Sequence, residues 1–322
     1  MGKRYAIDRK ETVSINGTTL HLRIRGTDAQ NPVLLFLHGG PGICDRHWVL
    51  KYQSALASRC TMVCYDQRGA GKSYTKAQAA QHMTVQDTVE DARAVVEYLC
   101  ETFHKDKIYL VGHSWGSMLG TLLCQQYPAH IAAYVGMGQV ADGPENERIS
   151  YEFVWNEAEQ REDKKALAEL TRIGAPVGGL YRSIADLQVQ RDYMTKYGGG
   201  TYNKKESLLT DLVIPLLLTP EYTLFDLIGY TKGAYYNLDE LWNEVATSSF
   251  LRTVPKLDVP VYITQGRHDR NTPPELAEQW FDQLEAPHKE WIWFENSAHS
   301  PIKEEPALWG QTILEKLFPE HA

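Results

Sequence analysis

Three short runs of consecutive apolar residues constrain the fold of this chain more than any other feature. They are VLLFLHG, CTMVCYD and KIYLVGH, at residues 33–39, 60–66 and 107–113. Apolar runs without alternation are typical of strands that are buried on both faces of a parallel sheet. Between the second and third runs, residues 84–103 carry apolar side chains at helical spacing. Strand, helix and strand in this order predict a parallel α/β sheet.

The pattern changes over residues 141–251, which are helical, charged and aromatic in character. Strand patterns return at residues 259–266 and 289–296, and each is followed by a helical segment. We therefore predict a sheet domain built from residues 1–140 and 252–322. Residues 141–251 would form a mostly helical cap, inserted at the carboxyl ends of the strands, where it would cover a site.

Composition limits the classes of partner. The chain has 33 Lys and Arg against 41 Asp and Glu, a net charge of −8, and no segment that concentrates basic residues. We therefore expect no nucleic-acid partner and no binding to an anionic membrane. No apolar run approaches the ~18–20 residues of a membrane span, and the N-terminus lacks the apolar core of a signal peptide. Five cysteines without a C-x-x-C pair suit a reducing compartment, so we expect a cytoplasmic protein.

A G-x-S-x-G motif stands at the most informative position in the chain. Gly112-His113-Ser114-Trp115-Gly116 directly follows the run KIYLV and precedes a helix-like segment. Such a tight strand-to-helix turn projects the serine hydroxyl at the carboxyl edge of the sheet, and its glycines are needed because side chains there would clash. We predict that Ser114 is a catalytic nucleophile.

A serine hydroxyl needs a base to take its proton, and the base needs an anionic partner. In this architecture the usual order along the chain is serine, acid, histidine. Asp269 follows the strand pattern of residues 259–266, and His299 follows that of residues 289–296. We predict that Asp269 is the acid and His299 the base.

Other residues compete for these two roles. Asp142 also follows an expected strand and is an alternative acid, while Glu295 is a weaker one. His268 is the rival histidine, but it adjoins Asp269, so a triad in the usual order could not use both.

Acyl transfer also needs two backbone donors aimed at the developing oxyanion. The N–H of Trp115, directly after the nucleophile, is one candidate. Gly40, in the loop His38-Gly39-Gly40-Pro41-Gly42 after residues 33–37, is the second, since Pro41 has no N–H.

The segment Asp66–Ser73, DQRGAGKS, contains Gly-Lys-Ser after a strand and so resembles a phosphate loop. It lacks the glycine that such a loop needs earlier in its sequence. We predict instead a structural turn against the HGGPG loop, with Asp66 or Arg68 in a buried ion pair. No metal-ligand pattern is evident, and we expect no metal and no cofactor.

Taken together, HGGPG, DQRGAGKS, GHSWGS, GRHD and SAHSP, in this order, resemble the α/β-hydrolase fold and, more narrowly, its proline iminopeptidase branch of serine peptidases. The resemblance covers roughly residues 11–140 and 252–318. It implies a mostly parallel sheet with a helical cap after the sixth strand. It also implies an aminopeptidase that releases an N-terminal residue, often proline, from short peptides through an acyl-enzyme. The roles given above to the serine, the acid, the base and the two donors agree with those of the family.

The resemblance further implies that cap carboxylates hold the α-ammonium group of the substrate. Our candidates are Glu145, Glu147 and Glu152, of which the first and last share a helix face. If these acids are only a solvated surface, the same triad suits a carboxylesterase, lactonase or amidase acting on a small metabolite. A non-catalytic binding protein of this fold is a third possibility, but an intact serine, acid and histidine in order argue against it.

Overall fold

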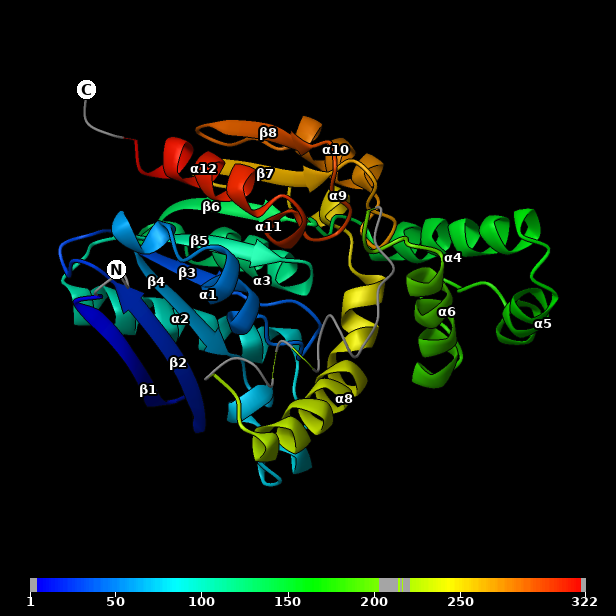
Figure 1. The fold of residues 1–322 in the computed structure, drawn as a ribbon, viewed down its shortest axis with the longest axis horizontal. Coiled ribbons are helices and arrows are strands. Elements are labelled where there is room, and N and C mark those ends of the chain that lie inside the picture. The colour runs from blue at the N-terminus through cyan, green and yellow to red at the C-terminus, as the bar shows by residue number, and fades with distance from the viewer. Residues whose placement is uncertain (1–4, 203–213, 215, 217–220, 320–322) are drawn as a thin grey trace.

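The computed structural model describes residues 5–202, 214, 216 and 221–319. At its centre is an eight-stranded sheet in the order β1-β2-β4-β3-β5-β6-β7-β8 (Figure 1). The second strand pairs antiparallel with both of its neighbours, and all other neighbouring strands are parallel. The strands are β1 (Ile7–Ile15), β2 (Thr18–Gly26), β3 (Val33–Leu37), β4 (Thr61–Asp66), β5 (Ile108–His113), β6 (Ile131–Met137), β7 (Val261–Gly266) and β8 (Lys289–Phe294). This confirms the predicted mostly parallel α/β sheet.

Helices cover both faces of the sheet. Those of the core are α1 (Arg46–Tyr52), α2 (Val85–Phe103), α3 (Trp115–Gln126), α9 (Phe250–Thr253), α10 (Pro274–Gln283), α11 (Pro301–Glu304) and α12 (Pro306–Leu317). Short 3₁₀ turns are η1 (Leu56–Ser58), η2 (Gly71–Ser73), η3 (Gln78–Ala80) and η4 (Pro128–His130). Among the described residues, the helices between β6 and β7 that lie outside the core are α4 (Gly143–Gln160), α5 (Lys164–Ile173), α6 (Ile184–Lys196) and α8 (Leu224–Thr247).

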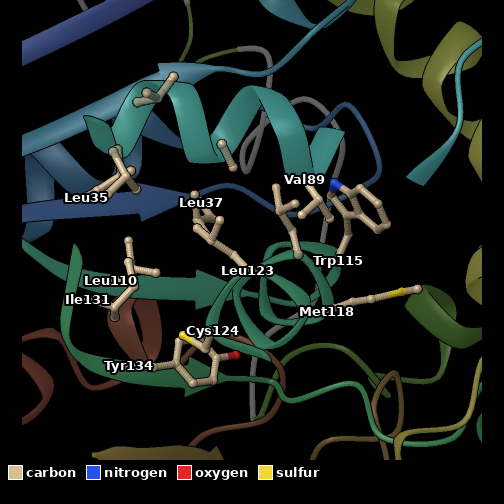
Figure 2. Packing of buried hydrophobic residues seen from close by; sticks show 14 of the residues in the cluster. Leu35, Leu37, Val89, Leu110, Trp115, Met118, Leu123, Cys124, Ile131 and Tyr134 are labelled. Atoms are coloured by element: carbon tan, nitrogen blue, oxygen red, sulfur yellow. The ribbon is translucent and has the colours of Figure 1, made fainter. Parts of the chain in front are cut away.

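The core has two layers because side chains alternate along each strand. In β3, Leu35 and Leu37 pack into the cluster formed with α2, α3 and α10. Leu34 and Phe36 pack into the other cluster, with α1 and α12. Figure 2 shows the first layer, where the side chain of Leu37 lies next to that of Leu123. Burial on both faces explains why this strand is a continuous apolar run.

The strand β2 differs from its sequence pattern. TTLHLRIRG alternates and predicts one solvated face, yet Arg23 is only 5% exposed. Its guanidinium pairs with Glu221 at 3.1 Å and also with Asp8.

These outlying helices come between β6 and β7 in the chain and lie to one side of the sheet (Figure 1). The segments that enter and leave them are joined: Gly143 N donates to Ser248 O at 2.7 Å, and Phe250 N to Ala141 O at 2.7 Å. Helices α4, α5 and α6 have a small apolar cluster of their own. These helices lie where we predicted the cap; the division of the chain into two domains stays a prediction.

Candidate active site

Ser114 occupies a sharp turn between β5 and α3. Its backbone has φ +55° and ψ −121°, an unusual conformation for a residue other than glycine. A Cβ on Gly112 would lie 2.3 Å from the carbonyl oxygen of Gly116, and one on Gly116 would lie 2.0 Å from that of Leu37. Both positions therefore exclude a side chain, as the motif predicts, and the turn presents Ser114 at the carboxyl edge of the sheet.

Asp269 and His299 are hydrogen-bonded, with 2.9 Å between Asp269 Oδ2 and His299 Nδ1. The aspartate is fully buried. It also accepts hydrogen bonds from the backbone nitrogens of Asn271 and Thr272, at 2.8 and 2.9 Å, and from Thr272 Oγ1 at 2.6 Å. Burial alone would raise the pKa of Asp269, but His299 and the bonds from Thr272 outweigh it and lower the pKa below its ordinary value.

The imidazole of His299 lies over the ends of β5 and β6. Its ring centroid is 5.0 Å from that of His113, the residue directly before Ser114. A Cβ on Gly138, just after β6, would lie 3.0 Å from its Cε1. The structure therefore brings His299 and Asp269 to the edge of the sheet that carries Ser114. Their catalytic roles stay predictions.

The competing candidates have other partners. Asp142 caps α4, accepting from Glu145 N at 3.0 Å, and also accepts from the hydroxyl of Ser249. Glu295 is exposed and pairs with Arg267 at 2.7 Å. His268 stacks on Tyr202 with 3.9 Å between ring centroids. Position after a strand is thus shared by several residues, and the contact with His299 singles out Asp269.

The two predicted oxyanion donors lie on either side of Ser114. Trp115 is the first residue of α3. On the other side, a Cβ on Gly39 would lie 3.3 Å from Ser114 Cβ, so the HGGPG loop runs against the serine. The donor roles of Trp115 and Gly40 stay predictions.

The segment after β4 is a structural turn, as predicted. Asp66 and Arg46 form a buried ion pair at 2.8 Å. Asp66 also accepts from Lys72 N and from Tyr222 Oη, both at 2.8 Å. Arg68 pairs with Asp91 at 2.6 Å. The aspartate faces inward and organises this turn.

The three cap acids have different surroundings. Glu145 and Glu152 are exposed and both pair with Arg148, at 2.8 and 2.6 Å. Glu147 is only 1% exposed, and its Oε1 accepts from Arg191 at 2.5 Å. Its second oxygen is buried and has no hydrogen-bond partner among the residues that the structure describes. Glu147 is therefore the one of these three candidates with an unused buried carboxylate oxygen.

Two residues beside the site were not singled out from the sequence. The hydroxyl of Thr272 holds Asp269 in place, next to the bond from Asn271 N, which has the two-residue spacing of a local aspartate turn. Gln67 contacts both His38 and Trp115. Gln67 lies inside the motif DQRG, but its two partners belong to other segments of the chain, so the motif alone does not reveal its role.

Within the residues described, no cluster of three or more His, Cys, Asp or Glu side chains could hold a metal ion. Nor does any helix in this described part of the chain have the length and apolar character of a membrane span.

A mostly parallel sheet with a serine on a strand-to-helix turn, and a histidine–aspartate pair at neighbouring strand ends, is the arrangement of α/β hydrolases. The chain belongs to the alpha/beta hydrolase fold family, whose model matches residues 32–306.

Relatives with curated names agree with the narrower resemblance. The chain is 36% identical over 310 residues to "Probable aminopeptidase YbaC" of Bacillus subtilis strain 168, covering 94% of this chain and 93% of that protein. It is 26% identical over 310 residues to a proline iminopeptidase of Lactobacillus delbrueckii subsp. bulgaricus, covering 93% and 94%. The crystal structure of a proline iminopeptidase from Mycobacterium smegmatis superposes with a TM-score of 0.66 at 19% identity, covering 96% and 97%. That last likeness concerns the fold alone.

Proposed function

We propose that this hydrolase is a serine aminopeptidase of proline iminopeptidase type, which releases the N-terminal residue of short peptides. The observation that carries the proposal is the bond between His299 Nδ1 and the buried Asp269, at the sheet edge that presents Ser114. The peptidase names of its relatives support the choice of substrate. We also propose that it works in the cytoplasm, where its five buried cysteines stay reduced.

The proposed reaction proceeds through an acyl-enzyme. Ser114 Oγ attacks the carbonyl carbon of the N-terminal residue while His299 takes the hydroxyl proton. Asp269 holds the Nδ1–H of His299, which keeps its other ring nitrogen free to accept that proton. The histidine then gives the proton to the leaving amine, and the shortened peptide departs. Water, activated by His299, hydrolyses the ester on Ser114 and releases the amino acid.

Two backbone groups would stabilise the tetrahedral intermediates. Negative charge develops on the former carbonyl oxygen, where the N–H groups of Gly40 and Trp115 would donate hydrogen bonds. Such donors act without reorganisation because they belong to a fixed backbone.

Glu147 is our candidate for binding the α-ammonium group. Helix α4 contacts the loop that carries Asp269, since Asn146 Nδ2 donates to Asn271 O at 3.0 Å and Ser150 Oγ to Arg270 O at 2.7 Å. The Oε2 of Glu147, which no described residue bonds, suits a cationic donor. A charge-assisted hydrogen bond of this kind contributes roughly 1.5–3 kcal/mol.

The test compares aminoacyl-naphthylamides that have a free amine with their N-acetylated forms, and with p-nitrophenyl esters, on one enzyme preparation. Acetylation removes the positive charge and adds bulk, so we expect kcat/KM to fall at least ~10²-fold. Equal rates on free and blocked substrates would contradict the peptidase proposal. A carboxylesterase, lactonase or amidase with the same triad would then be the better description.

A further inference from the structure

Gln67 lies between the two segments that flank Ser114. It follows β4 directly and is only 2% exposed. Its side-chain amide donates from Nε2 to His38 O at 3.0 Å and accepts at Oε1 from the indole Nε1 of Trp115 at 2.8 Å. One side chain thus joins the start of the HGGPG loop to the first residue of α3. Figure 2 shows the indole of Trp115 in the apolar layer near Val89, where burial makes an unpaired N–H costly.

The backbone of Gln67 fixes the tautomer of His38. Gln67 N donates to His38 Nε2 at 3.0 Å, so this ring nitrogen is an acceptor and carries no proton. The proton of the neutral ring is therefore on Nδ1, which lies 2.9 Å from Gly39 O and donates to it. Burial lowers the pKa of His38, which favours this neutral form.

The orientation of Gly39 O determines that of the Gly40 N–H. The same carbonyl oxygen also accepts from Ile43 N at 3.1 Å. Gly39 O and Gly40 N–H belong to one planar trans peptide unit and point in opposite directions. Two donors on the carbonyl therefore hold the amide of Gly40 in one orientation.

We propose that Gln67 and His38 are positioning residues that orient both oxyanion donors, the N–H of Gly40 through His38 and the N–H of Trp115 through its indole. The inference rests on the proposed function, since it concerns the same reaction. It gives the DQRG segment a role in catalysis beyond the buried ion pair of Asp66. Neither residue would touch the substrate.

A purely structural role makes a different prediction, which a matched variant can test. Gln53 is also a buried glutamine, 1% exposed, and donates to Ile302 O and Pro306 O at 3.1 and 3.0 Å. Gln67→Met and Gln53→Met each remove a buried amide of the same size. If Gln67 had only a structural role, both variants would lose thermal stability, and their kcat and KM would change little.

The experiment measures kcat, KM, melting temperature and inhibition by an aminoacyl boronate, whose tetrahedral adduct with serine places a hydroxyl at the oxyanion position. A fluorophosphonate probe counts reactive serines in each preparation. For Gln67→Met we expect kcat to fall about 10²-fold with KM nearly unchanged, because the donors are aimed at the transition state. Boronate affinity should fall with kcat, whereas Gln53→Met should keep both.

Trp115→Phe provides a second variant in case Gln67→Met does not fold. It removes the indole donor and keeps the backbone N–H, so kcat should fall about 10-fold, since misplacement of about 1 Å can cost up to 10²-fold. Adding Trp115→Phe to a folded Gln67→Met should lower kcat little further, because both remove the same bond.

Three results would overturn the inference. The first is a folded Gln67→Met or Trp115→Phe with wild-type kcat. The second is a fall in kcat that leaves boronate affinity unchanged. The third is a wild-type protein whose Ser114 does not react with the probe, which would overturn the proposed function and this inference with it.

Discussion

The backbone nitrogen of Ser114 donates a hydrogen bond to the carbonyl oxygen of Met137 at 2.9 Å. The bond ties the turn after β5 to the end of β6, the neighbouring strand. A serine with φ +55° is strained, and this bond together with the glycines around it offsets the strain. The turn therefore depends on the backbone, and the side chain of Ser114 can be changed without losing it.

Ser114→Ala should lower kcat by a factor on the order of 10⁴–10⁶, as expected when a triad nucleophile is removed. Alanine keeps the Cβ and adopts the same backbone conformation, so the melting temperature should change little. Steady-state kinetics on an aminoacyl-naphthylamide would measure the loss. If a folded variant keeps more than a tenth of the activity, Ser114 is not the nucleophile.

Asp269→Asn should lower kcat by roughly 10⁴, because an amide facing Nδ1 favours the wrong tautomer of His299. Asp142→Asn is the matched control, because Asp142 lies after the neighbouring strand β6, at the start of α4. It should keep kcat and lower stability only slightly, since asparagine also caps helices well. A damaging Asp142→Asn beside a mild Asp269→Asn would reverse the assignment of the acid.

Glu147→Gln should reduce the preference for free over N-acetylated substrates, because the carboxylate charge is lost. From the energy of a charge-assisted hydrogen bond, we expect the ratio of the two kcat/KM values to fall about 10-fold or more. Glu152→Gln, on the same helix but exposed, is the control and should keep the ratio. Equal ratios in both variants would remove Glu147 from substrate recognition.

His47 should make the folded protein less stable at acidic pH than at neutral pH. His47 is 1% exposed, and within the described part of the chain neither of its ring nitrogens has a hydrogen-bond partner. Burial lowers its pKa from 6.5 to about 4, so the unfolded chain binds a proton in this range that the folded chain does not. The free energy of unfolding should therefore fall as pH falls from 6.5 to about 4, by on the order of 2–3 kcal/mol for this residue.

The variant His47→Phe tests this effect, since its aromatic ring can keep the contacts with Trp48 and Tyr222. At neutral pH it should be about as stable as the wild type, because no hydrogen bond is lost. Urea unfolding at several pH values between 4 and 7 would show a shallower pH dependence. An unchanged slope would mean that other groups carry the acid sensitivity.

The sequence predicts the parts of this fold that depend on local pattern. Continuous apolar runs mark β3, β4 and β5 because these strands are buried on both faces. The tight turn at Ser114 could be predicted from its five-residue motif alone. The two glycines of the motif are required because a side chain at either position would clash with the backbone. Asp269 and His299 could be predicted because each lies shortly after the end of a strand, in the order that the motif leads one to expect.

Features that depend on distant contacts were not predictable. Glu147 and Glu145 are two residues apart on one helix, yet only Glu147 meets Arg191 and becomes buried. Arg23 is buried because Glu221, nearly two hundred residues away, reaches it. Gln67 likewise acquires its partners from two other segments. A pattern read along one segment contains no information about such partners.

The hydrogen bonds that join Gly143 to Ser248 and Phe250 to Ala141 mean that the outlying helices leave and rejoin the sheet at a single point. A segment whose ends adjoin can be exchanged for another of different length or shape without moving the strands beside it. Ser114, Asp269 and His299 all lie outside this segment, and Glu147 lies within it. If the proposed function holds, grafting the corresponding segment of a relative at this junction should change the preferred substrate, with the three proposed catalytic residues left in place.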